Sequence, residues 1–188
     1  MDFFVIYGLT IISLIITLVA QGFVSGSYRR YKKISNSRGM NGCNAAKEIL
    51  YKSGLSDVRV EEVSGVLADH YDPRDKTVRL STDVYHGTSI ASVSVAAHEV
   101  GHAIQYAEAY MPIRIRSSIV GITNFSSKIL YFLIVLSFVA NIPFFCDLAV
   151  ICFVIIFLFQ LITLPVEFNA SARAIRNIEY SGFNDSDL

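Results

Sequence analysis

Residues 129–164 read ILYFLIVLSFVANIPFFCDLAVICFVIIFLFQLITL, an apolar block in which Asp147 is the single charged residue. One helix of this length would be far longer than a hydrocarbon core of ~30 Å is thick. Asn141 and Pro143 interrupt the block, and both residue types are typical of turns. The block therefore predicts a hairpin of two transmembrane helices, over residues 119–164.

A second charge-free stretch, FFVIYGLTIISLIITLVAQGFV, occupies residues 3–24. It is long enough for one helix through a bilayer. A cleavable signal peptide would start with basic residues and have a shorter apolar core, whereas here Asp2 precedes a longer run. We therefore predict a retained transmembrane anchor over residues 1–24.

Basic residues flank the predicted spans on one side. Because such residues are enriched in cytoplasmic loops, they predict an external N-terminus and a cytosolic location for residues 25–118 and 165–188. A hairpin returns the chain to its starting side, so these two segments share one compartment. The basic residues are Arg29, Arg30, Lys32 and Lys33 after the anchor, Arg114, Arg116 and Lys128 before the hairpin turn, and Arg173 and Arg176 after it.

The polar region between the anchor and the hairpin combines helical and strand-like patterns. Apolar residues at helical spacing, followed by a glycine, indicate a short helix, and β-branched residues indicate two short strands. The predicted elements are a helix over 41–53, strands over 58–63 and 77–80 with a turn at 72–75, and a helix over 90–106 capped by Thr88 or Ser89.

The composition agrees with a membrane protein and excludes other classes. The chain has 188 residues, of which 53% are hydrophobic, and its 16 Lys and Arg balance 16 Asp and Glu. A nucleic-acid partner is not expected, because a nucleic-acid binder carries a basic surface. Three widely spaced cysteines form neither a disulfide framework nor a metal-binding pair. We predict a mainly α membrane protein that contains a small cytosolic α+β region.

The segment HEVGH at residues 98–102, on the last predicted helix of the polar region, is an HExxH motif. Its two histidines lie one turn apart on one helical face, so both can bind a single Zn²⁺. Glu99 can take a proton from a water that zinc has made more acidic. Gly101 permits the close approach of another backbone. The motif predicts zinc-dependent peptide hydrolysis with Glu99 as general base, in a cytosolic α+β region that is zincin-like.

The chain carries four segments in order: DHYDP at 69–73, LS at 80–81, SVAAHEVGHAIQ at 94–105 and LPVEFNAS at 164–171. With the apolar stretches between them, they resemble a family of bacterial membrane proteins, the YugP-like neutral zinc metallopeptidases. The resemblance covers nearly the whole chain and implies a multi-pass zinc peptidase of the bacterial cell membrane. Family members carry Asp where this chain has Asn169, and they continue into a further apolar segment beyond the position of Leu188.

A catalytic zinc site needs a third protein ligand besides two histidines. Glu108 and Glu167 are the candidates. Ten residues beyond the first histidine a continuing helix has turned by about 1000°, which points Glu108 some 80–120° away from the imidazoles. Glu167 follows the hairpin, near Pro165 at a predicted helix start, and resembles the distant Glu of gluzincins. The predicted zinc ligands are His98, His102 and Glu167.

Other polar residues are candidates for supporting roles. His70 and Asp69 precede a predicted turn, where peptidases of this class often place a group that stabilises the tetrahedral intermediate, and a local hydrogen bond is the alternative. We retain His70 as a candidate catalytic residue, whereas His86 reads as an ordinary loop histidine. Gluzincins often carry an acidic group four residues after the zinc-binding Glu. Ser171 occupies that position here, so Ser171 or Asn169 supports the ligands.

These patterns favour an integral membrane zinc endopeptidase that acts from the cytosolic side on peptide or membrane-protein substrates. A catalytically silent zinc-binding scaffold is the alternative, and hydrolysis of another amide is a third interpretation. Retention of Glu99 argues against the scaffold, because a structural zinc site closes with a fourth ligand and needs no base.

Overall fold

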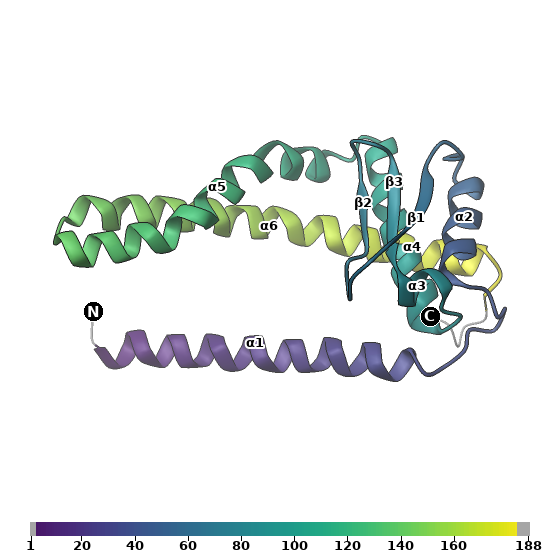
Figure 1. The fold of residues 1–188 in the computed structure, drawn as a ribbon, viewed down its shortest axis with the longest axis horizontal. Coiled ribbons are helices and arrows are strands. Elements are labelled where there is room, and N and C mark those ends of the chain that lie inside the picture. Colours follow the sequence, from purple (N-terminus) through teal and green to yellow (C-terminus); the bar gives the residue numbers. More distant parts are fainter. Residues whose placement is uncertain (1–2, 184–188) are drawn as a thin grey trace.

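A computed structural model describes residues 3–183 of the chain. Figure 1 shows two long helices as a hairpin, a third long helix running along them, and a small α/β unit at one end. The predicted mainly helical fold with a small sheet is confirmed. In chain order the elements are α1 (Phe3–Tyr31), α2 (Gly42–Lys52), β1 (Arg59–Val63), β2 (His70–Asp72), β3 (Thr77–Ser81), α3 (Thr82–His86), α4 (Ile90–Ala107), α5 (Met111–Ala140) and α6 (Pro143–Tyr180).

Among the described residues, three helices are long and apolar enough to cross a membrane: α5, α6 and, within α1, the stretch Ile11–Tyr31. Helices α5 and α6 pack against each other as a hairpin. Asn141 caps α5 with a left-handed backbone (φ 52°), a conformation that Asn tolerates better than most residues. The N-terminal end of α1 and the hairpin turn lie at the same end of the molecule, opposite the α/β unit (Figure 1).

The prediction that a separate helix begins near Pro165 is wrong, because α6 continues through this residue. A proline cannot donate to the carbonyl four residues earlier, which costs an isolated helix ~3 kcal/mol or more. The part of α6 before Pro165 and the part after it stay in one helix, because α6 packs against both α5 and α4. As a result, one helix joins the hairpin to Glu167. Helix α5 also begins earlier than the predicted 119, at Met111.

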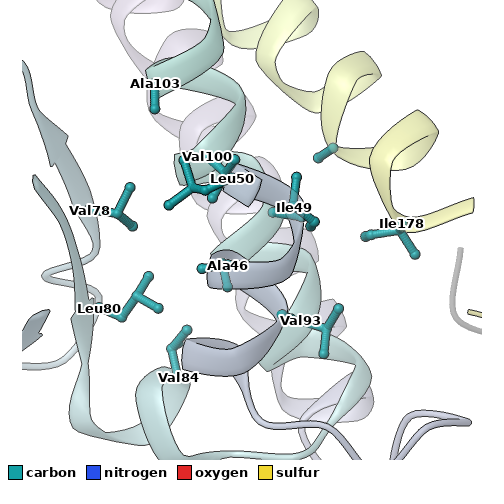
Figure 2. Packing of buried hydrophobic residues seen from close by; sticks show 14 of the residues in the cluster. Ala46, Ile49, Leu50, Val78, Leu80, Val84, Val93, Val100, Ala103 and Ile178 are labelled. Atoms are coloured by element: carbon teal, nitrogen blue, oxygen red, sulfur yellow. The ribbon is translucent and has the colours of Figure 1, made fainter. Parts of the chain in front are cut away.

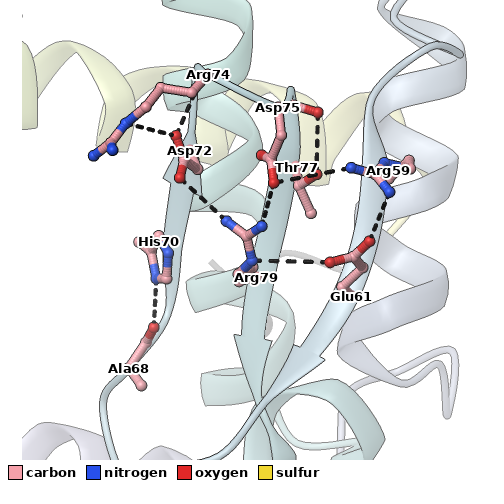
Figure 3. A network of polar contacts seen from close by, with 9 residues as sticks. All are labelled: Arg59, Glu61, Ala68, His70, Asp72, Arg74, Asp75, Thr77 and Arg79. Carbon is pink, nitrogen blue, oxygen red and sulfur yellow. Dashed lines mark hydrogen bonds and ion pairs between the residues drawn. The ribbon is translucent and has the colours of Figure 1, made fainter.

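The sheet has the order β1-β3-β2, with β1 parallel and β2 antiparallel to β3. Two of its strands match the predicted ones, but β2 was missed because its three residues HYD show no apolar alternation and lead into Asp72-Pro73, a turn signal. Figure 3 shows ion pairs across the strands, including Arg79 with Asp72 (3.3 Å) and with Glu61 (3.8 Å). Strand β2 is therefore an edge strand tied to its neighbour.

The core of the α/β unit lies between α2, the sheet and α4, and the end of α6 closes it (Figure 2). Local caps define its helices: the side chain of Asn41 accepts a hydrogen bond at the start of α2, and that of Ser89 does so at the start of α4. The core therefore holds α4 against α6. Its buried members include Ile49, Leu50, Val78, Leu80, Val93, Val100 and Ile178.

Candidate metal centre

Helix α4 carries His98 and His102 one turn apart, with their ring centroids separated by 4.9 Å. Glu167 reaches both rings from α6. Its Oε2 lies 3.2 Å from His98 Nε2 and 3.5 Å from His102 Nε2. One ligand atom from each of the three residues lies within 4.8 Å of the others. The three predicted ligands therefore converge on one point.

These separations fit a zinc ion. Two ligand atoms that each lie 2.0–2.1 Å from a tetrahedral metal are about 3.3 Å apart. The two distances from the Glu167 carboxylate, 3.2 and 3.5 Å, lie close to this value. Two imidazoles and one carboxylate are also the ligand set of catalytic zinc sites that keep a fourth position for water. The donor set thus fits a catalytic zinc ion.

Gly101 allows α6 to bring Glu167 this close. A Cβ atom at Gly101 would lie 2.7 Å from the carbonyl oxygen of Ala170 and 3.3 Å from its Cα, so the two helices touch backbone to backbone. Val166 and Ala170, which flank Glu167 on α6, are fully buried at this contact. The predicted close approach at Gly101 is confirmed.

We expect Gly101→Ala to destabilise the protein and lower its zinc content. The obstructing atom is a backbone carbonyl, so relief requires a shift of α6, and overpacking of this kind costs roughly 1–3 kcal/mol. Gly121→Ala on α5 is the matched control, because a Cβ there meets nothing within 4 Å. Thermal unfolding in detergent and metal analysis provide the readout. Equal melting temperatures for the two variants would contradict the role of this contact.

The Nδ1 atom of each imidazole, which is not the nitrogen that faces Glu167, also has a hydrogen-bond partner. His98 Nδ1 lies 3.2 Å from Ser171 Oγ, and His102 Nδ1 lies 3.0 Å from Gln105 Oε1. The fully buried Gln105 donates from Nε2 to the Val166 carbonyl (2.8 Å) and to a side chain of α6, which leaves its Oε1 to accept from His102. A histidine that donates from Nδ1 presents an unprotonated Nε2 to a metal. These contacts therefore orient both rings for metal binding.

The structure places both predicted supporting residues near the histidines. Ser171 contacts His98 directly, whereas Asn169 acts through Gln105, whose Nε2 donates to Asn169 Oδ1 (2.9 Å). The sequence interpretation missed Gln105, to which it gave no role. Its position three residues after His102, on the same helical face, was the available signal.

Glu108 does not join this group. It caps the end of α4, where its carboxylate accepts a hydrogen bond from Arg173 Nη2 (2.7 Å). This contact lowers the pKa of Glu108. Arg173 also donates to Asn169 Oδ1 (2.7 Å). Glu108 therefore links the end of α4 to α6 through Arg173. This agrees with the prediction that its side chain points away from the imidazoles.

Glu99 follows His98 on α4 and lies half-buried in the same cleft as the three converging residues. Burial raises the pKa of its carboxyl, partly offset by the neighbouring histidines. A carboxylate beside a metal-binding group can accept a proton from a bound water and return it later, as general acid–base catalysis requires. The position of Glu99 therefore suits a general base.

The cleft has a volume of about 530 Å³ and extends from β2, past the converging residues, to α5. His70 lines it and is exposed on β2, where its Nδ1 lies 2.7 Å from the Ala68 carbonyl oxygen (Figure 3). Asp69 instead accepts hydrogen bonds from the backbone N–H (2.7 Å) and the hydroxyl (3.0 Å) of Ser81. His70 thus stays a candidate for contact with a substrate, whereas Asp69 fastens the edge strand.

The expectation that His86 lies in a loop is wrong, because it ends helix α3. Its Nε2 lies 3.1 Å from Glu62 Oε2 on the exposed surface. A helix of five residues gives too short a pattern to be recognised in the sequence. His86 lies outside the cleft and outside the metal-binding group.

Residues 6–187 match a family described as "Putative neutral zinc metallopeptidase". The chain belongs to this family. It is 44% identical over 175 residues to "Putative membrane protease YugP" of Bacillus subtilis (strain 168), a match that covers 93% of this chain and 78% of the relative. No solved structure matches the chain significantly.

Membership in the family confirms the resemblance seen in the four sequence segments and implies zinc as the metal. The relative is named as a membrane protease, which agrees with the apolar helices of this chain. The His and Glu residues that converge between α4 and α6 are the place where the described structure could hold such an ion.

Proposed function

We propose that this chain is an integral membrane zinc endopeptidase. The observation that carries the proposal is the contact of Glu167 with both His98 and His102. Glu167 lies 69 residues after His98 in the sequence, and both predicted spans of the hairpin lie between these two residues. Three ligands leave a fourth position for water, and Glu99 is adjacent in the same cleft. A structural zinc site in a scaffold would need neither feature, so the silent alternative is not favoured.

His98, His102 and Glu167 would hold the zinc ion, which supplies a Lewis acid that polarises a carbonyl and lowers the pKa of water to about 7. Glu99 accepts the proton of the attacking water on its carboxylate and returns it to the leaving amine, as the new C–O bond forms and the C–N bond breaks. Ser171 and Gln105 keep the imidazoles oriented. His70 would stabilise negative charge on the carbonyl oxygen, a role supported by its position in the lining of the cleft.

The same arrangement indicates the class of substrate. The cleft reaches Val120 on α5, a helix long and apolar enough to span the bilayer. A peptide bound there would lie near the membrane surface. We therefore propose that the substrates are peptide segments of proteins in or near the membrane. The lipid bilayer is the second proposed partner and surrounds the apolar helices.

We expect reporter fusions to place the active site in the cytosol of a bacterial cell. A reporter after Lys33 should read cytosolic, one near Asp147 external, and one at the C-terminus cytosolic again, because basic residues flank the spans on the side of the α/β unit. A cytosolic signal near Asp147 would show that the hairpin does not cross the bilayer. A re-entrant hairpin would still leave Glu167 beside the histidines, so the metal site would survive that result.

Metal removal tests the proposed function directly. We expect the purified protein in detergent to contain about one zinc per chain and to cleave membrane-anchored test peptides. A chelator should abolish the cleavage, and restoring about one equivalent of zinc should recover it. Cleavage that persists after complete removal of the metal would contradict the proposal.

A further inference from the structure

Arg116 lines the same cleft as the metal-binding residues, from the first turns of α5. Its Nε is buried and has no hydrogen-bond partner in the described part of the chain. Its guanidinium lies over the ring of Phe159 on α6, with Cζ 5.7 Å from the ring centroid. A carboxylate does not lie within ion-pair distance of it among residues 3–183. Arg116 is therefore a partly buried cation without an anionic partner.

Three other charged groups of the cleft are already engaged, and the carboxyl of Glu99 does not lie within ion-pair distance of Arg116 among the described residues. Arg74 pairs with Asp72 (3.6 Å), Asp69 binds Ser81, and Glu167 contacts the two histidines. The buried Nε–H of Arg116 has lost its hydration without gaining a hydrogen bond, which is unfavourable unless a bound acceptor compensates it. This imbalance makes the part of the cleft near Arg116 a site for an anionic group.

Arg116 and the metal-binding residues line one cleft, and a contact of the next residue ties this part of α5 to the helix that carries the histidines. Ser117 Oγ lies 2.6 Å from the hydroxyl of Tyr106. Tyr106 follows His102 by four residues on α4, about 6 Å along the helix axis. Because one residue of an extended peptide spans roughly 3.3 Å, an anion bound by Arg116 belongs to a residue near the reacting bond.

We propose that Arg116 determines specificity by binding a carboxylate of the peptide substrate, on an acidic side chain or at the free C-terminus, within a few residues of the cleaved bond. This inference rests on the proposed function, because a peptide is the ligand. A guanidinium matches a carboxylate with two parallel hydrogen bonds. A lipid headgroup is disfavoured because Arg116 lies in the cleft, whereas Arg114, two residues earlier, is exposed.

The test measures binding, so it does not depend on hydrolysis. The parent protein carries Glu99→Gln, and its affinity for fluorescent peptides is measured by anisotropy in neutral detergent. In one set of peptides, Asp or Asn occupies one position at a time along the peptide. In a second set, the peptide C-terminus is either a free carboxylate or an amide. Arg116→Gln is compared with the matched control Arg114→Gln, and Arg116→Lys keeps the charge but loses the paired geometry. Cleavage by the wild-type chain is assayed separately and reports on the proposed function alone.

We expect the parent and Arg114→Gln to prefer a carboxylate over the amide by about 10–100-fold in one of the two sets, and the set that shows it identifies the source. Arg116→Gln should lose this preference while its affinity for amide peptides stays unchanged, and Arg116→Lys should retain part of it. A parent without any acid preference, or a preference that survives in Arg116→Gln, overturns the proposal. Binding of phosphatidylglycerol that depends on Arg116, without an acid preference among peptides, overturns it as well and assigns the residue to a headgroup.

Discussion

Glu99→Gln is expected to lower peptide cleavage by at least ~10²–10⁴-fold while zinc content and melting temperature stay unchanged. The amide keeps the shape of the side chain and part of its hydrogen bonding but cannot accept the proton of the attacking water. Glu99 lies in the cleft beside the converging histidines without being one of the three grouped ligands, so its loss should spare the metal. Cleavage of a membrane-anchored peptide and metal analysis of the same preparation provide the measurement.

Glu108→Gln is the matched control for this experiment. Glu108 ends the same helix, but its carboxylate is engaged by Arg173. We expect this variant to cleave at close to the wild-type rate. Equal activity of wild type and Glu99→Gln, with zinc present in both, would falsify the general-base mechanism. Absence of activity in both, with zinc bound, would instead support the scaffold interpretation.

Glu167→Ala is expected to reduce zinc from about one ion per chain to a small fraction after dialysis. Two imidazoles alone are too few for a stable site, and loss of a ligand lowers affinity by much more than the 10–100-fold typical of residues that only orient the ligands. Activity should fall in parallel. Because a bound metal stabilises the folded state, the melting temperature in the presence of zinc should also fall.

Two further variants make this result specific. Glu108→Ala removes a carboxylate that the structure pairs with Arg173, so zinc content should stay near the wild-type level. Ser171→Ala removes only the contact with His98 Nδ1, so a reduction of about 10–100-fold in affinity is expected. Loss of zinc in Glu108→Ala together with its retention in Glu167→Ala would move the ligand role to Glu108.

Local patterns predicted the parts of the fold that depend on neighbours in the sequence. The charge-free stretches match α1 and the hairpin. Helical spacing closely located α2, with a following glycine, and α4, with a capping residue. The two short segments β2 and α3 were missed, because three and five residues are too few to establish a period. The proline signal at Pro165 misled the prediction, because tertiary packing outweighs the local cost of proline inside α6.

The HExxH segment, its helix and the membership of the family follow from the sequence alone, because these depend on residues within one turn or on ordered motifs. The sequence favoured Glu167 over Glu108 as the third ligand, but only the packing of α6 against α4 brings Glu167 to the histidines. Gly101 lets the backbone of α6 reach α4, and the continuous α6 then carries Glu167 to 3.2 Å from His98. The roles of Gln105 and the unpaired Arg116 likewise follow from contacts between α4, α5 and α6. Such contacts join residues far apart in the chain, and a pattern confined to one segment contains no information about them.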